Sequence, residues 1–486
     1  MKNYIAIDIG ASSGRLILSY FENEVIQLEE IYRFKNKFRK EAGYERWDMD
    51  YLIQEILQGL SFAKEKDITS CYVGIDTWAV DYCLLDKAGN RLDQPIAYRD
   101  SRTEDAVATF SEKMPLATLY EKTGIQIQSF NTIFQLFVEE KDRLAKAETL
   151  LLIPDYLGYV FTGKAVTEKT NASTMQLLHA GTQNWNQDIL QLLDITEALF
   201  PPLVDAGTVL GRLRQEDFIE YDLPEAVFVS IASHDTASAV LGTPGEGADW
   251  AYISSGTWSL LGVETTVADV SKEAFIANYT NEWGVHNTIR FLKNIMGMWL
   301  IQEVARMQEY YYSYAELVDM AETVPPFQQF VDVNDERFLN PTNMIEELQS
   351  YCQETKQTVP QTAAEIARCV YDNLALCYAA ELQKLETLTG TTEKICKLHI
   401  VGGGSNNRLL NQLTADIANI EIEAGPSEAT AIGNIVMQMI CTGVFTDAAE
   451  ARHAIHRSFD CSVHQPRPMD PMILQNYQLF IKEVSK

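Results

Sequence analysis

The chain has 486 residues, with 68 acidic and 39 basic side chains and a formal net charge of −29. This length exceeds one compact core, so we expect two domains, residues 1–243 and 244–486. So acidic a surface excludes nucleic acid and anionic membranes as partners. The eight cysteines form no C-x-x-C pair and the N-terminus lacks an apolar signal core, so we expect a cytoplasmic protein without zinc sites or disulfides.

A β-hairpin is the first element that the sequence predicts. Apolar runs within residues 4–18 flank a turn rich in glycine and serine, and Asp8 ends the first strand. The amides and hydroxyls of such a turn can surround a polyphosphate, while Asp8 can hold Mg²⁺ through water. An ordinary hairpin with a polar turn is the alternative.

Sugar-binding chemistry is indicated by a polar cluster further along, residues 98–102, Tyr-Arg-Asp-Ser-Arg. Carboxylate and guanidinium groups bond hydroxyls, and an aromatic ring can cover the carbon face of a sugar. A solvated turn with a surface ion pair is the alternative. Residues 158–165 nearly match a phosphate-binding Walker A loop but lack its final Ser or Thr, so we predict a helix here that ends at Gly163.

The centre of the chain predicts a strand, then a short helix over residues 237–241 with Ser233 or Asp235 as its N-cap. Glycines and a proline at residues 242–247 predict a linker between the domains. The strand at residues 251–254 then enters a Ser-Ser-Gly-Thr turn, which repeats the layout of the first hairpin. We interpret Asp235 as a catalytic base and the two hairpins as the mark of a domain duplication.

The second half of the chain offers one further nucleotide signal. Three glycines at residues 402–404 precede a helix, an arrangement that lets a nucleotide approach closely, although it is not the dinucleotide pattern G-x-G-x-x-G. Residues 291–303 predict a largely apolar helix. Thr362 and Glu365 form a capping box for a long helix that we expect to end at Gly390.

Several of these segments together carry a family resemblance. The stretches GASSGR, GIDTWAVDY, YRDSRT, SHDTASAV, SSGTWSL, LKNIMGMWL and VGGGSNN resemble the FGGY family of carbohydrate kinases, within the actin- and hexokinase-like ATPases. The resemblance implies an α/β fold of two duplicated RNase H-like (actin-like ATPase) domains around a central cleft. It also implies that ATP and Mg²⁺ serve to phosphorylate L-rhamnulose at its 1-hydroxyl, with another ketose or polyol, such as L-fuculose or xylulose, as the alternative substrate.

The resemblance also assigns roles to individual residues. The residues it implies for ATP are Ala11, Ser12, Ser13, Gly14, Arg15, Thr257, Gln302 and Gly403. Those it implies for the sugar are Ala79, His234, Asp235, Thr236 and Asn294, with Asp235 as general base. Ala79 stands where the family usually has a glycine. The expected partners are the sugar and ATP, bound to a monomer or a homodimer.

Two other classes of function stay open at this point. An actin-like or chaperone-like nucleotide switch would share the hairpins but would not need the cluster at residues 98–102 or an acid like Asp235. A nucleotide-dependent oxidoreductase would use the glycine loop and would bind NAD rather than ATP.

Overall fold

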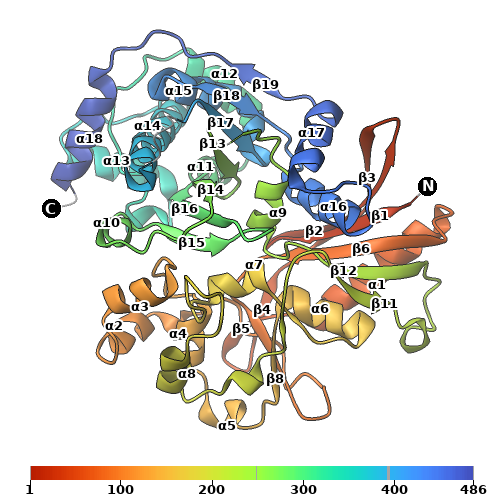
Figure 1. Cartoon of the computed structure of the whole chain (residues 1–486). Helices are drawn as coiled ribbons and strands as arrows, with labels where there is room; N and C mark the ends of the chain where they lie inside the picture. The colour runs from red at the N-terminus through yellow and green to blue at the C-terminus, as the bar shows by residue number, and fades with distance from the viewer. Residues whose placement is uncertain (1, 248, 391–394, 485–486) are drawn as a thin grey trace. The chain divides into compact units, whose positions relative to one another are not determined.

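The chain forms two compact units in the computed structural model, which describes residues 2–247, 249–390 and 395–484 (Figure 1). Unit 1 comprises Met1–Pro244, Glu264–Phe291 and Ala429–Ser458. Unit 2 comprises Gly245–Val263, Leu292–Glu428 and Phe459–Lys486. The chain therefore returns to unit 1 twice after first leaving it.

Unit 1 is built on a six-stranded sheet with the order β11-β12-β6-β1-β2-β3. In that order the strands are Thr208–Arg212, Glu225–Ser230, Ser70–Thr77, Tyr4–Ile9, Ser13–Glu22 and Val25–Lys35. Strand β1 pairs antiparallel with β2 and parallel with β6, so Asp8 lies opposite both Arg15 and Asp76. Because β6 also pairs parallel with β12, the carboxyl ends of three strands meet at one edge of the sheet.

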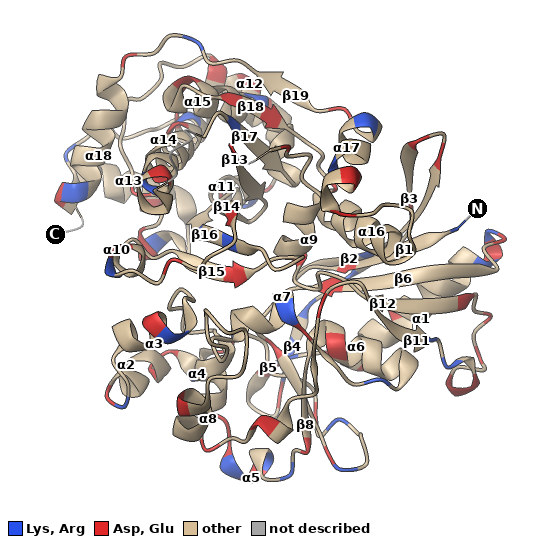
Figure 2. Cartoon of the chain, in the orientation of Figure 1, with Lys and Arg blue, Asp and Glu red and all other residues tan. Residues whose placement is uncertain are grey.

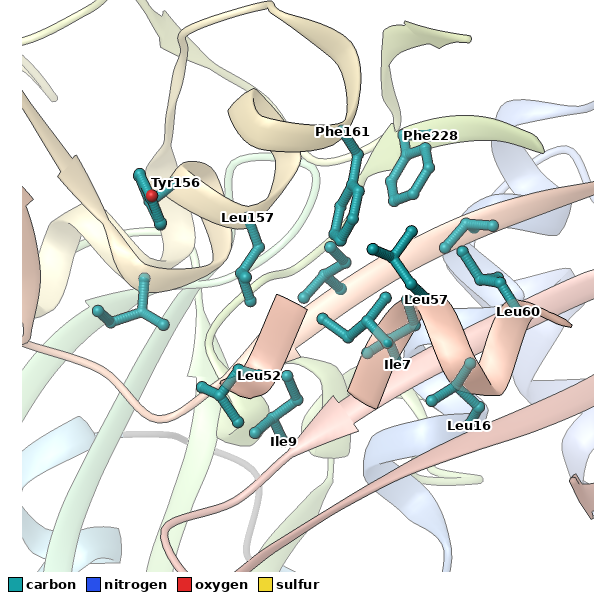
Figure 3. Close-up of a cluster of buried hydrophobic side chains, with 14 of the residues drawn as sticks. Ile7, Ile9, Leu16, Leu52, Leu57, Leu60, Tyr156, Leu157, Phe161 and Phe228 are labelled. Carbon is teal, nitrogen blue, oxygen red and sulfur yellow. The ribbon is translucent and has the colours of Figure 1, made fainter. Parts of the chain in front are cut away.

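One face of this sheet packs against helices α1 (Met49–Glu65) and α6 (Ile153–Thr162) (Figure 3). Alternate residues of β1, including Ile7 and Ile9, point into this core, as the period of two in a strand requires. The ring of Phe161 from α6 stacks on Phe228 of β12 with centroids 5.2 Å apart. Helix α6 ends at Gly163 in the left-handed conformation, which confirms the helix predicted in place of a Walker A loop.

The other face of the sheet carries helix α16 (Ala429–Cys441), which packs on α9 (Asp235–Leu241) and is followed by α17 (Ala448–Ser458). Asn434 donates to the Gly74 carbonyl of β6 at 3.1 Å, and Gln438 donates to the Ile5 carbonyl of β1 at 3.1 Å. A Cβ atom added to Gly433 would collide with the Ser238 carbonyl. Helix α9 therefore reaches α16 only because position 433 has no side chain.

The rest of unit 1 is a helical region with its own core, which includes Phe110, Phe134 and Trp185. The remaining strands of unit 1 are β4 (Phe38–Glu41), β5 (Tyr44–Trp47), β7 (Tyr82–Leu85), β8 (Thr149–Leu152), β9 (Thr167–Glu168), β10 (Leu203–Val204) and β15 (Thr280–Trp283). Its remaining helices are α2 (Ala106–Ser111), α3 (Leu116–Thr123), α4 (Thr132–Phe137), α5 (Lys141–Leu144), α7 (Lys169–Ala172), α8 (Gln187–Leu193) and α10 (Lys272–Ile276).

Unit 2 repeats the arrangement of strands seen at the start of unit 1. Strand β13 pairs antiparallel with β14 and parallel with β17, within the order β14-β13-β17-β18-β19. These strands are Trp258–Thr265, Trp250–Ser255, Lys397–Val401, Glu421–Ala424 and Ser462–His464. The helices are α11 (Trp299–Met307), α12 (Tyr314–Glu322), α13 (Met344–Glu354), α14 (Ala363–Thr389), α15 (Arg408–Ala418) and α18 (Met472–Val484). Helix α14 has the predicted capping box of Thr362 and Glu365 and ends at Gly390.

The prediction of one helix over residues 291–303 is wrong. Ile289–Met296 forms strand β16, and helix α11 begins only at Trp299. At Gly297 the backbone turns against β14, where an added Cβ would lie 2.7 Å from the carbonyl carbon of Trp258. The apolar run fitted either a strand or a buried helix, and this close backbone contact ends the strand at the glycine.

Charged residues occur in both units, with acidic side chains (red) and basic ones (blue) interspersed along helices and loops (Figure 2). The net charge of −29 is therefore spread along the chain rather than held by one acidic tail. Within the described ranges, no helix combines the length and apolar character that a membrane crossing requires.

We predict that Gly433→Ala destabilises the protein although alanine is the better helix former. The gain in helix propensity is about 1 kcal/mol, whereas overpacking against a backbone carbonyl that cannot move costs about 1–3 kcal/mol. Thermal unfolding measures the outcome, with Cys441→Ala at the partly exposed end of the same helix as the control. A higher melting temperature for Gly433→Ala would show that the two helices separate at little cost.

Candidate active site

The hairpin of β1 and β2 ends in a partly exposed turn beside a paired carboxylate. Arg15 donates from Nε and Nη2 to one oxygen of Asp8, at 3.0 and 2.8 Å. The Gly10 amide closes the turn by donating to the Ser13 carbonyl at 2.9 Å. Among the described residues, the backbone amides of Ala11 and Ser12 take part in no hydrogen bond. The turn can therefore offer amide donors to an anion.

Asp76 lies opposite Asp8 in the sheet and is completely buried. Asn434 donates to one oxygen of this carboxyl group at 2.6 Å. Burial and the nearby charge of Asp8 raise the pKa of Asp76 well above its ordinary value. The neutral form of Asp76 is therefore favoured, while the half-buried Asp8 faces the guanidinium group of Arg15.

The loop between β12 and α9 carries three residues assigned by resemblance, His234, Asp235 and Thr236. The N-cap prediction is wrong, because His234 occupies that position and Asp235 is the first helical residue. The hydroxyl of Ser233 instead donates to Glu168 at 2.7 Å. The amide and hydroxyl of Thr236 donate to Oδ1 of Asp235 at 2.6 and 3.1 Å, so the Asp235 carboxylate is held at the start of the helix.

His234 lies between Asp235 and a buried ion pair that sequence patterns did not reveal. Its Nε2 is 3.3 Å from Oδ1 of Asp235, and its Nδ1 is 3.2 Å from Nη2 of Arg290. Arg290 pairs in turn with Glu282 at 3.0 Å. The same Nδ1 lies 3.3 Å from Oε2 of Glu282, so the imidazole is placed between Asp235 on one side and the pair of Arg290 and Glu282 on the other.

These neighbours adjust the acidity of the two carboxylates around His234. Burial raises the pKa of Asp235, the positive charge of His234 lowers it, and Asp8 raises it again, with a net increase. For Glu282, burial acts to raise the pKa, but Arg290 and His234 outweigh it and lower the value. Asp235 is therefore the better proton acceptor of the pair, and Glu282 remains a fixed negative charge.

Ala79 lies in a strained loop after β6. The next residue, Val80, has a φ of 69°, which is unusual for a β-branched side chain, and Thr132 donates to its carbonyl at 2.7 Å. Asp81 is buried and accepts from the indole groups of Trp47 and Trp78 at 2.6 and 2.9 Å. The loop is thus held in one conformation by groups that surround it on several sides.

The cluster at residues 98–102 is only partly available to a ligand. Asp100 accepts from the Glu45 amide at 2.8 Å, and Arg102 forms a buried ion pair with Glu139 at 3.1 Å. Arg99 is exposed and donates to the Tyr98 hydroxyl at 3.0 Å. Asp100 and Arg102 therefore bond to other parts of the protein. Neither the sugar-binding nor the surface-turn interpretation describes the whole cluster.

The four remaining predicted residues belong to unit 2, and three of them surround the turn between β13 and β14. The exposed Thr257 accepts at its carbonyl from the Trp299 amide at 3.2 Å, at the start of the helix that carries Gln302. The glycine loop lies against the same turn, since a Cβ on Gly402 would be 2.8 Å from the Ser255 carbonyl oxygen. Gly403 is the exposed member of that loop, and Asn294 lies part-buried in β16.

The donor set of unit 1 suits Mg²⁺ held largely by water. In the part of the chain that the structure describes, no three His, Cys, Asp or Glu side chains are grouped to hold a metal ion. The side chain of Asp8, in contrast, is 12% exposed, and Arg15 donates twice to its Oδ2. Since Mg²⁺ retains much of its hydration shell and binds through one or two carboxylates, Asp8 fits that role.

Sequence reasoning missed Glu168, Glu282 and Arg290, and it assigned no role to Asp76 and Asp81. A carboxylate or guanidinium group is recognised as buried only when its partner is known, and these partners are distant in the chain. The short spacing of Trp78 and Asp81 was the one local signal, because an indole N–H needs an acceptor when it is buried.

Comparisons with known proteins agree with this arrangement. The N-terminal and C-terminal domain models of the FGGY family of carbohydrate kinases match residues 3–242 and 251–441. Rhamnulokinases from Enterococcus faecalis and Lactiplantibacillus plantarum are 64% and 51% identical, over 100% of this chain and 98% and 99% of their own. Gluconate kinase from Lactobacillus acidophilus has the same fold, with a TM-score of 0.81 at 17% identity over 99% of this chain and 96% of its own. The predicted two-domain fold is confirmed.

We predict that alanine at Gly404 lowers the thermal stability, whereas alanine at Gly403 lowers the affinity for ATP. A Cβ at Gly404 would overlap the Ser255 side chain, so Gly404→Ala should lower the melting temperature. A Cβ at Gly403 meets no atom within 4 Å, so Gly403→Ala should melt like the wild type but bind ATP more weakly if a nucleotide lies against it. Calorimetric titration with ATP beside thermal melts tests both, and unchanged ATP affinity in Gly403→Ala would remove that residue from the site.

Proposed function

Because the chain belongs to the FGGY family of carbohydrate kinases, we propose that it transfers the γ-phosphoryl group of ATP to the 1-hydroxyl of L-rhamnulose, in the catabolism of L-rhamnose. The observation that carries this proposal is the 64% identity to the Enterococcus faecalis rhamnulokinase over essentially the full length of both chains. The geometry of unit 1 supports it, since a carboxylate with a raised pKa lies among side chains that can bond hydroxyl groups.

In this proposal Asp235 accepts the proton of the attacking hydroxyl. Thr236 and the imidazole of His234 hold the Asp235 carboxylate in place, and Glu282 keeps Arg290 directed at the imidazole. His234, Thr236 and the backbone of Ala79, which all belong to unit 1, bind the sugar. A positioned base matters here because phosphoryl transfer depends mainly on alignment and on charge stabilisation.

The nucleotide is assigned to the two hairpin turns and the glycine loop. The turn residues Ala11, Ser12, Ser13 and Gly14, with Arg15, bind the phosphates through amides, hydroxyls and charge. Thr257, Gln302 and Gly403 bind the rest of ATP. Mg²⁺, with Asp8 as its contact through water, would supply charge compensation on the transferring group. Without it, the hairpin amides and Arg15 remain the donors that face the phosphates.

The substrate assignment is tested by measuring ADP release with L-rhamnulose, L-fuculose, xylulose and glycerol at equal concentrations. We expect slow ATP hydrolysis without sugar and the highest kcat/KM with L-rhamnulose. A higher kcat/KM for another acceptor would reassign the substrate within the family. Equal ADP release with and without every acceptor would favour a nucleotide switch instead.

We predict that Asp235→Asn lowers kcat by about 10²–10⁴-fold, the usual contribution of a general base. The amide keeps the size of the side chain, so the melting temperature and the affinity for ATP should change little. Asp188→Asn, at an exposed position on α8, is the matched control and should retain wild-type kcat. Wild-type turnover in Asp235→Asn would show that Asp235 only orders the start of α9.

A further inference from the structure

Glu168 is a completely buried carboxylate at the end of β9. Its Oε1 accepts from the Thr170 amide at 2.9 Å. Its Oε2 accepts from the Thr170 hydroxyl at 2.7 Å, the Asn171 amide at 3.1 Å, and both the amide and the hydroxyl of Ser233 at 3.1 and 2.7 Å. A buried carboxyl group needs such partners, and here they come from two segments far apart in the chain.

The two segments differ in what they do. Thr170 and Asn171 open the short helix α7, so their bonds to Glu168 are an N-terminal cap. A cap needs no contribution from Ser233, which is the residue before His234. The Ser233 carbonyl also accepts from the Thr77 amide at the end of β6, at 3.0 Å. Ser233 is thus fixed on one side by the sheet and on the other by Glu168.

We propose that Glu168 is a positioning residue for catalysis, which sets the place of His234 and Asp235 by holding Ser233. This inference rests on the proposed function, because it requires Asp235 to act in the reaction. Asp235 lies two residues beyond Ser233, so a shift of the Ser233 backbone is passed directly to the start of α9. Misplacing a reacting group by about 1 Å can cost two orders of magnitude in rate.

The chain provides a matched pair of variants, because the hydroxyls of Thr170 and Ser233 donate to the same oxygen at the same distance of 2.7 Å. Ser233→Ala removes the donor on the catalytic loop, and Thr170→Val removes the donor on the cap. Both should lower the melting temperature. Only Ser233→Ala should lower kcat, by about ten- to a hundredfold, with the KM for ATP unchanged. Thr170→Val should retain kcat because both amides still cap α7.

Glu168→Gln gives a second measurement on the carboxylate itself. The amide oxygen can replace Oε2, where four donors converge, while its NH₂ group then faces the Thr170 amide. We expect a lower kcat, because the neutral amide oxygen accepts more weakly from Ser233 than the carboxylate does. When Ser233→Ala is added, the loss in kcat should be smaller than the product of the two single losses, since both changes weaken the same contact.

The proposal is overturned if Ser233→Ala melts lower but retains wild-type kcat, or if the losses in kcat of the double variant multiply. The assay uses whichever acceptor the wild-type enzyme phosphorylates best. Failure of the substrate assignment then shows in the wild type, whereas failure of the positioning role shows only in the variants. If Glu168→Gln does not fold, comparing kcat of Ser233→Ala with kcat of Thr170→Val still tests the positioning role of Glu168.

Discussion

The parallel pairing of β6 with both β1 and β12 is the constraint on which the chemistry of unit 1 depends. Its register sets Asp8 beside Asp76, and the bridge between Thr77 and His234 extends it into the loop that carries Asp235. Several carboxylates thereby crowd at one edge of the sheet, where they cannot all be charged at low cost. Burial favours the neutral form of Asp76, Arg15 compensates Asp8, and His234 faces Asp235.

Both units use the same solution to hold a turn at the end of a strand. The two strands of each hairpin pair antiparallel, and a parallel strand on the other side of the first strand fixes its register. In unit 2 the glycine loop packs directly against the hairpin turn. It can do so because Gly402 and Gly404 have no side chains that would collide with Ser255. Backbone contacts of this kind leave the turn residues exposed for a ligand while their position stays fixed.

Local patterns predicted the parts of this structure that depend on local physics. The hairpin at Asp8, the glycine loop and the capped helix α14 follow from turn chemistry, strand alternation and capping residues. The N-cap prediction at Ser233 failed because a distant carboxylate, Glu168, takes its hydroxyl. The helix predicted over residues 291–303 failed because an apolar run carries no period that separates a buried strand from a buried helix. The return of two late segments to unit 1 also left no local signal.

Because residues 429–458 belong to unit 1, the folding of this unit during synthesis depends on a late part of the chain. Strands β1, β6 and β12 are complete by Ser230, but α16, which bonds the Gly74 and Ile5 carbonyls, begins at Ala429. At about 5–20 residues per second, a ribosome needs about 10–40 s to add the roughly 200 residues between them. Throughout that interval the nascent sheet presents one face without the helix that later covers it. Newly synthesised chains therefore have a window in which chaperones, or a wrong partner, reach this face first.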